Sequence, residues 1–455
     1  MLPEPLTREV LSAAPAVVRL PPAADVVPWA MAVGSAGLER GGAIVILPTA
    51  ARAGWLARQL RGRGLPVALL PDEWASVAAG NVIAVGTRSA AWAPLHPVGA
   101  ALVVDSHDEA LREERAPTWD AASVLSERCR RDGSPCVRTS PCPTLEDLEW
   151  GRLFTLPRAE ERKGWPALEI LDRRDADPRD GLLTPRVVTA VRDGGRVVCV
   201  INRKGRAGLL ACGTCQAVAT CERCGDAVAQ DAVGSLMCAR CGQVRPVVCT
   251  ECGSARLKAL RPGTTRLAEH LAALTGEHMP ELTGAARAGE VGEGARVMIG
   301  TEAALRRAGR RDTVVFLDFD QELLAPRFRA ADQAMALLAR AARMVAGRKG
   351  RVIVQTRQPD HVVLAAARSA DPALLAQSER AQRGELGLPP YSAMALVTGP
   401  SATEFVAGVG GVIGVAGDGD RYLLRAPDVS SLCDGLAAAP RPAGRVRVEV
   451  DPQRI

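Results

Sequence analysis

A run of four C-x-x-C pairs between Cys212 and Cys252 constrains this chain more than any other feature. Each pair directs two thiolates at one point, and two pairs complete the four-thiolate tetrahedron of a zinc site that is closed to water. The nearest histidine, His270, lies outside the run, so an open catalytic zinc has no evident ligand set. The run therefore predicts two structural zinc ions per chain, bound by Cys212, Cys215, Cys221, Cys224, Cys238, Cys241, Cys249 and Cys252.

The four pairs can be shared between the two metals in sequential or in nested order, and both orders satisfy the ligand count. The five residues between Cys215 and Cys221 are a tight link for a sequential knuckle, whereas the thirteen between Cys224 and Cys238 leave room for a hairpin. Spacing therefore favours nesting, with an inner site of Cys221, Cys224, Cys238 and Cys241 and an outer site of Cys212, Cys215, Cys249 and Cys252.

A disulfide framework or a redox C-x-x-C is the alternative to metal binding. No secretory signal precedes the run, and the other five of the 13 cysteines are scattered singly. This usage fits a reducing cytosol. We therefore expect a cytoplasmic, nucleoid-associated protein.

Length and charge set broad limits on the protein class. The 455 residues suffice for about two to four domains, and no run approaches the apolar length of a membrane span. A net charge of +6 permits nucleic acid binding without arguing for it. Basic residues gather in two clusters, which either contact phosphates or form a solvated face: Arg306, Arg307, Arg310 and Arg311, and Arg340, Arg343, Arg348, Lys349 and Arg351.

Short apolar stretches alternate with helical ones in two regions, the pattern of parallel α/β sheets. Strands are expected at 41–49, 65–70, 81–85 and 100–105, then at 196–201, 295–299, 313–317 and 351–355, with a helix at 331–345. The passage 155–186 predicts a linker or peripheral loop, and the segment from 371 onward a small α+β domain. The expected domains are a first lobe (1–190), a second lobe (191–211 and 253–368), the Cys-rich module (212–252) and a C-terminal domain (369–455).

Several motifs occur in the order found in one known family. Asn202, Arg203 and Gly205 precede the cysteines as N-R-x-G. The further stretches are G-T-R-S-A at 86–90, G-T-E at 300–302, D-x-D with P-x-F-R-A at 318–330, Q-T at 355–356, and E…R…L-P-P-Y at 379–391. These stretches resemble the primosomal replication-restart family (PriA, primosomal protein N′), relatives of superfamily 2 DNA helicases. The resemblance implies two RecA-like helicase lobes with the double-zinc module inserted, nested zinc pairing, and a small C-terminal α+β domain.

Three motifs that drive a helicase of this kind are degraded here. No G-K-[ST] triplet occurs, and the position of the phosphate loop, before the strand at 43–47, reads RLPPAADVVPW. The family's DEEH, whose acids hold Mg²⁺ and polarise the attacking water, is Asp105-Ser106-His107-Asp108, which keeps only the first carboxylate in register. Residues 343–350 stand where the family has QVAGRAGR, and Arg348 is the one candidate arginine finger there. Downstream of G-T-Q the family has lysine-glycine-histidine-aspartate, which Arg306-Arg307-Ala308-Gly309 replace here. We expect no ATP-driven unwinding, with nucleotide binding without turnover left open.

The family normally begins with a domain that captures a DNA 3′ end and a winged helix, whereas this chain starts at or just before the first lobe. Either the start is truncated or this form lacks those domains. We expect a DNA-binding protein of replication restart and primosome assembly, with forked or single-stranded DNA and primosome proteins as partners and no membrane. Arg203, Lys204 and Arg206 are the candidate phosphate contacts, with plain surface charge as the alternative. The other two hypotheses are an active ATP-dependent 3′–5′ helicase and a zinc-stabilised interaction protein that binds no DNA.

Overall fold

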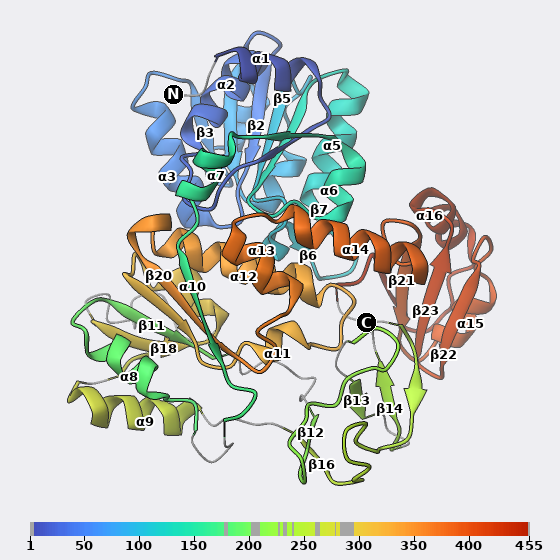
Figure 1. Cartoon of the computed structure of the whole chain (residues 1–455). Helices are drawn as coiled ribbons and strands as arrows, with labels where there is room; N and C mark the ends of the chain where they lie inside the picture. The colour runs from blue at the N-terminus through green and yellow to red at the C-terminus, as the bar shows by residue number, and fades with distance from the viewer. Residues whose placement is uncertain are drawn as a thin grey trace.

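The computed structural model describes residues 4–176, 181–201, 210–225, 228–230, 234–238, 241–259, 264–277, 279–282 and 295–453. In Figure 1 the N-terminal lobe lies at the top, a second lobe lies below it, and the C-terminal domain and the Cys-rich module lie at the right. The predicted fold class is confirmed: two parallel α/β lobes, an inserted Cys-rich module and a small α+β domain. Among the described helices, none combines the length and apolar character needed to cross a membrane.

The first lobe is a seven-stranded sheet in the order β3-β4-β2-β5-β8-β1-β9, with parallel pairing throughout. Ala43 and Val45 join one core cluster while Ile44 and Ile46 join another. The sheet is thus buried on both faces, which requires helices on both sides. The predicted strands of this lobe are confirmed, but β1, β8 and β9 were missed.

The elements of this lobe are α1 (Glu4–Ser12), β1 (Ala16–Arg19), α2 (Val27–Leu38), β2 (Gly42–Ile46), α3 (Ala50–Arg61), β3 (Val67–Leu69), α4 (Trp74–Ala78), β4 (Val82–Gly86), η1 (Arg88–Trp92), β5 (Ala100–Val104), η2 (Glu109–Leu111), β6 (Arg112–Glu113), β7 (Trp119–Asp120), α5 (Ala121–Asp132), β8 (Cys136–Ser140), α6 (Leu145–Trp150), β9 (Arg152–Thr155) and α7 (Arg158–Lys163).

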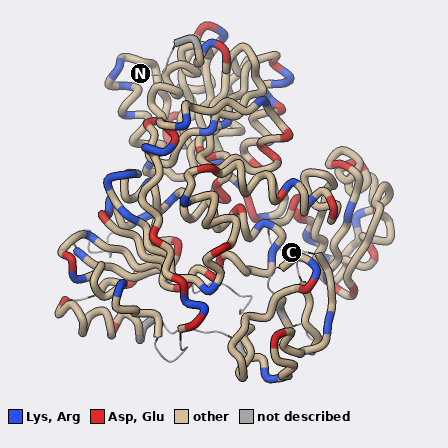
Figure 2. Tube along the Cα trace, in the orientation of Figure 1, with Lys and Arg blue, Asp and Glu red and all other residues tan. Residues whose placement is uncertain are grey.

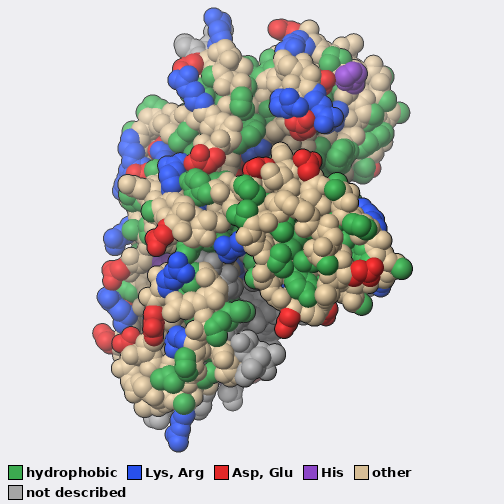
Figure 3. Space-filling model, turned by 90° about the vertical axis from the view of Figure 1, so that its right-hand side faces the viewer, with side chains coloured by type: hydrophobic (Ala, Val, Ile, Leu, Met, Phe, Trp, Pro, Cys, Tyr) green, Lys and Arg blue, Asp and Glu red, His purple; other side chains and the backbone are tan. Residues whose placement is uncertain are grey.

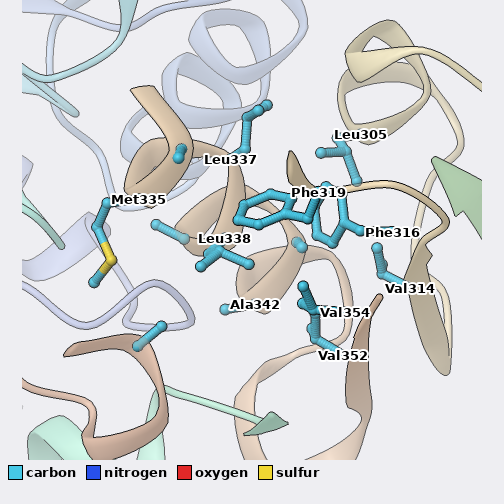
Figure 4. Packing of buried hydrophobic residues seen from close by; sticks show 14 of the residues in the cluster. Leu305, Val314, Phe316, Phe319, Met335, Leu337, Leu338, Ala342, Val352 and Val354 are labelled. Carbon is cyan, nitrogen blue, oxygen red and sulfur yellow. The ribbon is translucent and has the colours of Figure 1, made fainter. Parts of the chain in front are cut away.

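The second lobe is a six-stranded parallel sheet in the order β10-β20-β19-β11-β18-β17. One face packs against the long helix α12, as Figure 4 shows for Phe316, Phe319 and Leu338. The elements are β10 (Ala167–Asp172), α8 (Pro185–Arg192), β11 (Val197–Val200), α9 (Thr264–Thr275), β17 (Glu281–Leu282), β18 (Val297–Gly300), α10 (Glu302–Arg307), β19 (Thr313–Phe316), α11 (Asp320–Leu323), α12 (Ala330–Met344), η4 (Gly347–Lys349), β20 (Arg351–Thr356) and α13 (Val362–Ser369).

The passage predicted as a linker, 155–186, contains a strand of the second sheet, and this corrects the prediction. Strand β10 pairs with β20 from Ala167 opposite Arg351 to Asp172 opposite Thr356. It was missed because it is a half-exposed edge strand in a charge-rich stretch, where Glu169 forms an ion pair with Arg186. The predicted lobe boundary at residue 190 is therefore wrong, since β10 and α8 belong to the second lobe. The division into four domains otherwise stays a prediction.

The Cys-rich module leaves the second lobe after β11 and returns at α9. Its described strands are β12 (Leu210–Cys212) paired with β16 (Leu257–Ala259), and a three-stranded antiparallel sheet of β13 (Val228–Gln230), β14 (Leu236–Cys238) and β15 (Val244–Arg245). Its apolar cluster is small and includes cysteine side chains. A module with so little core depends on cross-links or metal for its stability.

The C-terminal domain is a four-stranded antiparallel sheet in the order β22-β23-β21-β24. Helix α14 (Ala373–Leu386) leads into β21 (Ala393–Thr398), α15 (Ala402–Ala407), β22 (Gly414–Asp418), β23 (Arg421–Ala426), α16 (Val429–Ala438) and β24 (Arg447–Val450). Hydrophobic side chains are scattered over the face that Figure 3 presents, and exposed apolar residues of this domain include Ile413, Val415 and Val429.

Candidate metal centres and interlobe site

The eight paired cysteines form two groups of four, in the nested arrangement that spacing favoured. In the outer group Cys212 lies 3.5 Å from Cys252, and Cys215 lies 3.5 Å from Cys249, between Sγ atoms. In the inner group the same distance separates Cys221 from Cys241 and Cys224 from Cys238. All four Sγ atoms of each group lie within 4.8 Å of one another.

This geometry fits a tetrahedral metal with four thiolate ligands. Zinc–sulfur bonds of about 2.3 Å place the sulfur atoms of a tetrahedron roughly 3.8 Å apart. Within the described residues no histidine or carboxylate joins either group. Each group can therefore hold one ion in a closed shell, the arrangement of a structural site.

The same backbone turn positions the thiolates of all four pairs. In each, the residue after the second cysteine donates its N–H to the carbonyl of the first, at 2.9–3.0 Å. That residue has a positive φ in every turn, and it is glycine in three of them and Gln216 in the fourth. Glycine adopts this left-handed conformation without the steric cost that a side chain adds. The sequence signature is thus C-x-x-C-G, with one exception.

The candidate DNA contacts Arg203, Lys204 and Arg206 lie outside the described residues, as do Asn202 and Gly205. Their placement next to the module stays a prediction.

The segment RLPPAADVVPW runs from the last residue of β1 through a loop into the first turn of α2, the strand–loop–helix position where a phosphate loop is expected. Its chemistry is unsuited to phosphate, which is held by backbone N–H groups at a helix N-terminus. Pro21, Pro22 and Pro28 have no N–H. The N–H of Val27 donates to Asp25 at 3.0 Å, and that of Ala30 donates to the Val26 carbonyl. Few donors are left for an anion.

Asp105, at the end of β5, is bound by two guanidinium groups. Arg343 donates to both of its oxygens, from Nη1 to Oδ2 at 2.9 Å and from Nη2 to Oδ1 at 2.6 Å, and Arg52 donates to Oδ2. Burial opposes ionisation, but the charges of Arg343 and Arg52 outweigh it and hold the pKa of Asp105 well below its usual range. The carboxylate that would hold Mg²⁺ in a motor is occupied by arginine.

Asp108 is bound in the same way. Arg306 donates to Oδ1 at 2.7 Å and Arg340 to Oδ2 at 3.2 Å, and both arginines belong to the second lobe. Against the effect of burial, these two charges lower the pKa of Asp108. Between the two acids, Ser106 donates to Asp147 at 2.7 Å and His107 Nδ1 lies 2.9 Å from Ser140 Oγ. The polar side chains of this stretch are therefore engaged with protein partners.

Arg348, the candidate arginine finger, is exposed on η4. Arg343, five residues earlier on α12, instead reaches the first lobe, where its Nε also donates to the Pro22 carbonyl at 2.9 Å. One side chain of the sixth motif thus contacts both the loop at the first motif's position and the acid at the second's.

The D-x-D motif lies at the carboxyl end of β19. Asp320 accepts hydrogen bonds from the Thr356 hydroxyl and the Arg357 N–H, the latter at 3.0 Å. Burial, with the nearby charge of Asp320, raises the pKa of Asp318 to about 6. Gln355 donates to the Leu182 and Leu317 carbonyls at 2.7 and 2.9 Å. Hydrogen bonds of the D-x-D and Q-T motifs therefore link the carboxyl ends of β19 and β20 in the second sheet.

A second buried ionic network joins both lobes to the C-terminal domain. Its most buried cations are Arg329 and Arg383, and Asp451 accepts from Arg329 at 2.8 Å and pairs with Arg112 at 2.6 Å. The carboxylates around Arg329 and Arg383 are Glu146, Asp332, Glu379 and Asp451. A cavity of about 610 Å³ lies beside this network and is lined by residues of all three units.

Sequence reasoning placed Asp105 in register with a family motif and named Arg306, Arg340 and Arg343 only within basic clusters that contact phosphates or form a solvated face. It did not name Arg52, and it paired none of these arginines with Asp105 or Asp108. Arg340 and Arg343 lie three residues apart on one helix, and both reach acids of the other lobe. The sequence shows that two arginines share one helix face. That this face lies against the acids of the first lobe follows only from the relative placement of the lobes.

Curated proteins that are similar to this chain carry the name of the family that the motifs resemble. No protein-family model matches the chain. The replication restart protein PriA of Bacillus subtilis (strain 168) is 27% identical over 407 residues, which cover 78% of this chain and 49% of that protein. The probable replication restart protein PriA of Mycobacterium tuberculosis (strain CDC 1551 / Oshkosh) is 30% identical over 352 residues, which cover 73% of this chain and 54% of that protein.

The chain thus spans about half the length of the curated relatives that it matches. Among solved structures, Saccharomyces cerevisiae Dbp5 bound to RNA and ADP BeF3 is similar, with a TM-score of 0.44 and 13% identity. That match covers 82% of this chain and 89% of the Dbp5 chain.

Proposed function

Because the chain is a relative of the replication restart protein PriA family, we propose that it is a DNA-binding protein of replication restart that lacks a nucleotide-driven motor. The observation that supports the lack of a motor is the pairing of Asp105 with Arg343. In a motor the acid at this position holds Mg²⁺. Here the two groups neutralise each other, and the loop beside them is rich in proline.

Zinc is the metal proposed for both cysteine groups. Four thiolates at tetrahedral spacing suit zinc, which has no redox chemistry and accepts this ligand set readily. Cys212, Cys215, Cys249 and Cys252 would hold one ion, and Cys221, Cys224, Cys238 and Cys241 the other. Bound zinc would supply folding free energy to a module with little apolar core.

Forked or single-stranded DNA is the proposed ligand, with primosome proteins as further partners. Arg203, Lys204 and Arg206 are the first candidates for phosphate contacts, because they stand beside the metal module in the sequence. Phosphate neutralisation makes affinity fall steeply with salt. Replacing all three by alanine should weaken binding to every DNA sequence and reduce the salt slope by about three.

The test is fluorescence anisotropy of a labelled fork between low and high salt, for the zinc-replete protein and this triple variant. Arg130→Ala/Arg131→Ala, which removes two exposed arginines of α5, serves as the matched control. Salt-dependent fork binding that only the triple variant weakens supports the proposal. Fork binding that is absent at every salt concentration would leave the zinc-stabilised interaction protein as the better account.

A further inference from the structure

Ion pairs between opposite lobes engage the two acids that stand at the position of a helicase motor's Mg²⁺-binding motif. Asp105 and Asp108 follow β5 in the first lobe, whereas Arg306 lies on α10 and Arg340 and Arg343 lie on α12 in the second. Figure 2 shows charged residues of both signs along the line where the lobes meet. Three guanidinium groups of one lobe thus bind two carboxylates of the other.

These contacts are partly buried and directional. The acids Asp105 and Asp108 are 3% and 7% exposed, whereas the side chains of their partners are partly exposed, Arg340 at 12%, Arg306 at 26% and Arg343 at 32%. Arg343 binds Asp105 through two parallel hydrogen bonds, a bidentate geometry that is more directional than a single contact. Its Nε adds a third bond, to the Pro22 carbonyl. The pairs therefore favour one relative placement of the lobes.

Both carboxylates of the site are paired with arginine without a ligand, four guanidinium groups facing two acids. Arg52, from the same lobe as Asp105, also donates to that carboxylate, so Asp105 faces two positive charges. Asp108 faces two more, from Arg306 and Arg340. Positive charge that a metal ion would bring to a motor site is supplied here by side chains.

We propose that these pairs form an interlobe clamp that holds the two lobes in one closed arrangement and needs neither nucleotide nor Mg²⁺. In a two-state molecule a ligand shifts the equilibrium only by its differential affinity for the two states. Because arginine already binds Asp105, the acid that would hold the Mg²⁺ of a nucleotide, ATP with Mg²⁺ is expected to leave closure unchanged. The clamp concerns the shape of the protein and holds whether or not the chain binds DNA.

Single-molecule energy transfer between the lobes tests the clamp. Dyes are attached to non-natural residues placed at Arg63 in the first lobe and Arg192 in the second, both exposed, because the chain's cysteines rule out thiol labelling. The protein with an intact clamp should give one narrow distribution of transfer efficiency, and ATP with Mg²⁺ should leave that distribution unchanged. In Asp105→Asn/Asp108→Asn the distribution should broaden and shift to lower efficiency, since the cross-lobe pairs lose their anions.

Asp172→Asn is the matched control, because it removes an exposed aspartate whose ion pair with Arg174 lies within the second lobe. If the double variant does not fold, the milder Arg340→Gln, which leaves Arg306 on Asp108, replaces it and should give a smaller shift of the same sign. A shift of the clamp-intact protein toward closure on adding ATP and Mg²⁺ overturns the proposal. So does a folded double variant whose distribution matches that of the control.

Discussion

Arg380 and Arg383 lie three residues apart on α14, yet the Arg383 side chain is 0% exposed and that of Arg380 is 52% exposed. Arg383 donates to Glu379 at 2.9 Å and to Asp332, while Arg380 donates to Glu149 at 3.2 Å near the surface. Arg383→Met should lower the free energy of unfolding by about 3–5 kcal/mol, because it leaves buried carboxylates without their cation. Arg380→Met should change it by less than about 1 kcal/mol. The measurement is the urea midpoint of each variant, and equal midpoints would show that the buried network does not stabilise the junction.

Gln216 has a left-handed backbone conformation, and we expect its replacement by glycine to raise stability. Its φ of 69° suits glycine, which the other three cysteine turns use at the same place. Gln216→Gly should therefore stabilise the outer metal site by about 1 kcal/mol, and Gly253→Ala, in the turn that completes the same site, should destabilise it similarly. Competition with a chromogenic zinc chelator measures both changes. A Gln216→Gly variant that loses zinc faster than the native chain would contradict the strain argument.

Asp318 makes stability depend on pH in a defined window. Its pKa is raised to about 6 in the folded protein by burial and by the charge of Asp320, above the value of an unfolded aspartate. A raised pKa means that the folded state is favoured by protonation, so this group stabilises below about pH 4 and loses that contribution as the pH rises through 6. Asp318→Asn should raise the thermal midpoint at pH 8, with a gain that shrinks toward pH 5. Asp360→Asn, at an exposed aspartate, should show no such trend.

The inner metal site can be removed alone. Cys221→Ser/Cys224→Ser should release one zinc per chain and leave the other in place, because the two groups share no ligand. Cys433→Ser, at an exposed cysteine outside both groups, is the control. Metal content by mass spectrometry decides the matter, and a double variant that still binds two zinc ions would refute the assignment of the inner site.

The sequence was informative wherever local pattern and chemistry agree. Strands such as β2 and β11 are short apolar runs, and the cysteine spacing favoured the nested grouping that the structure has. Strand β10 was missed because an edge strand carries charge on its open face, as Glu169 does. The partners of Asp105 were missed for another reason: Arg343 lies 238 residues away, and no local pattern encodes a contact between lobes.

The central claim of the proposal is that this chain, which is similar to PriA proteins, binds forked DNA without hydrolysing ATP. The most direct measurement follows phosphate release and fork anisotropy in the same tubes, with zinc-replete protein, ATP and Mg²⁺. We predict that the fork binds and that phosphate release stays at the level of the protein-free control, because Asp105 is held by Arg343 and the phosphate loop is rich in proline. Phosphate release that rises when the fork is added would contradict the account and favour a working helicase with a divergent nucleotide site.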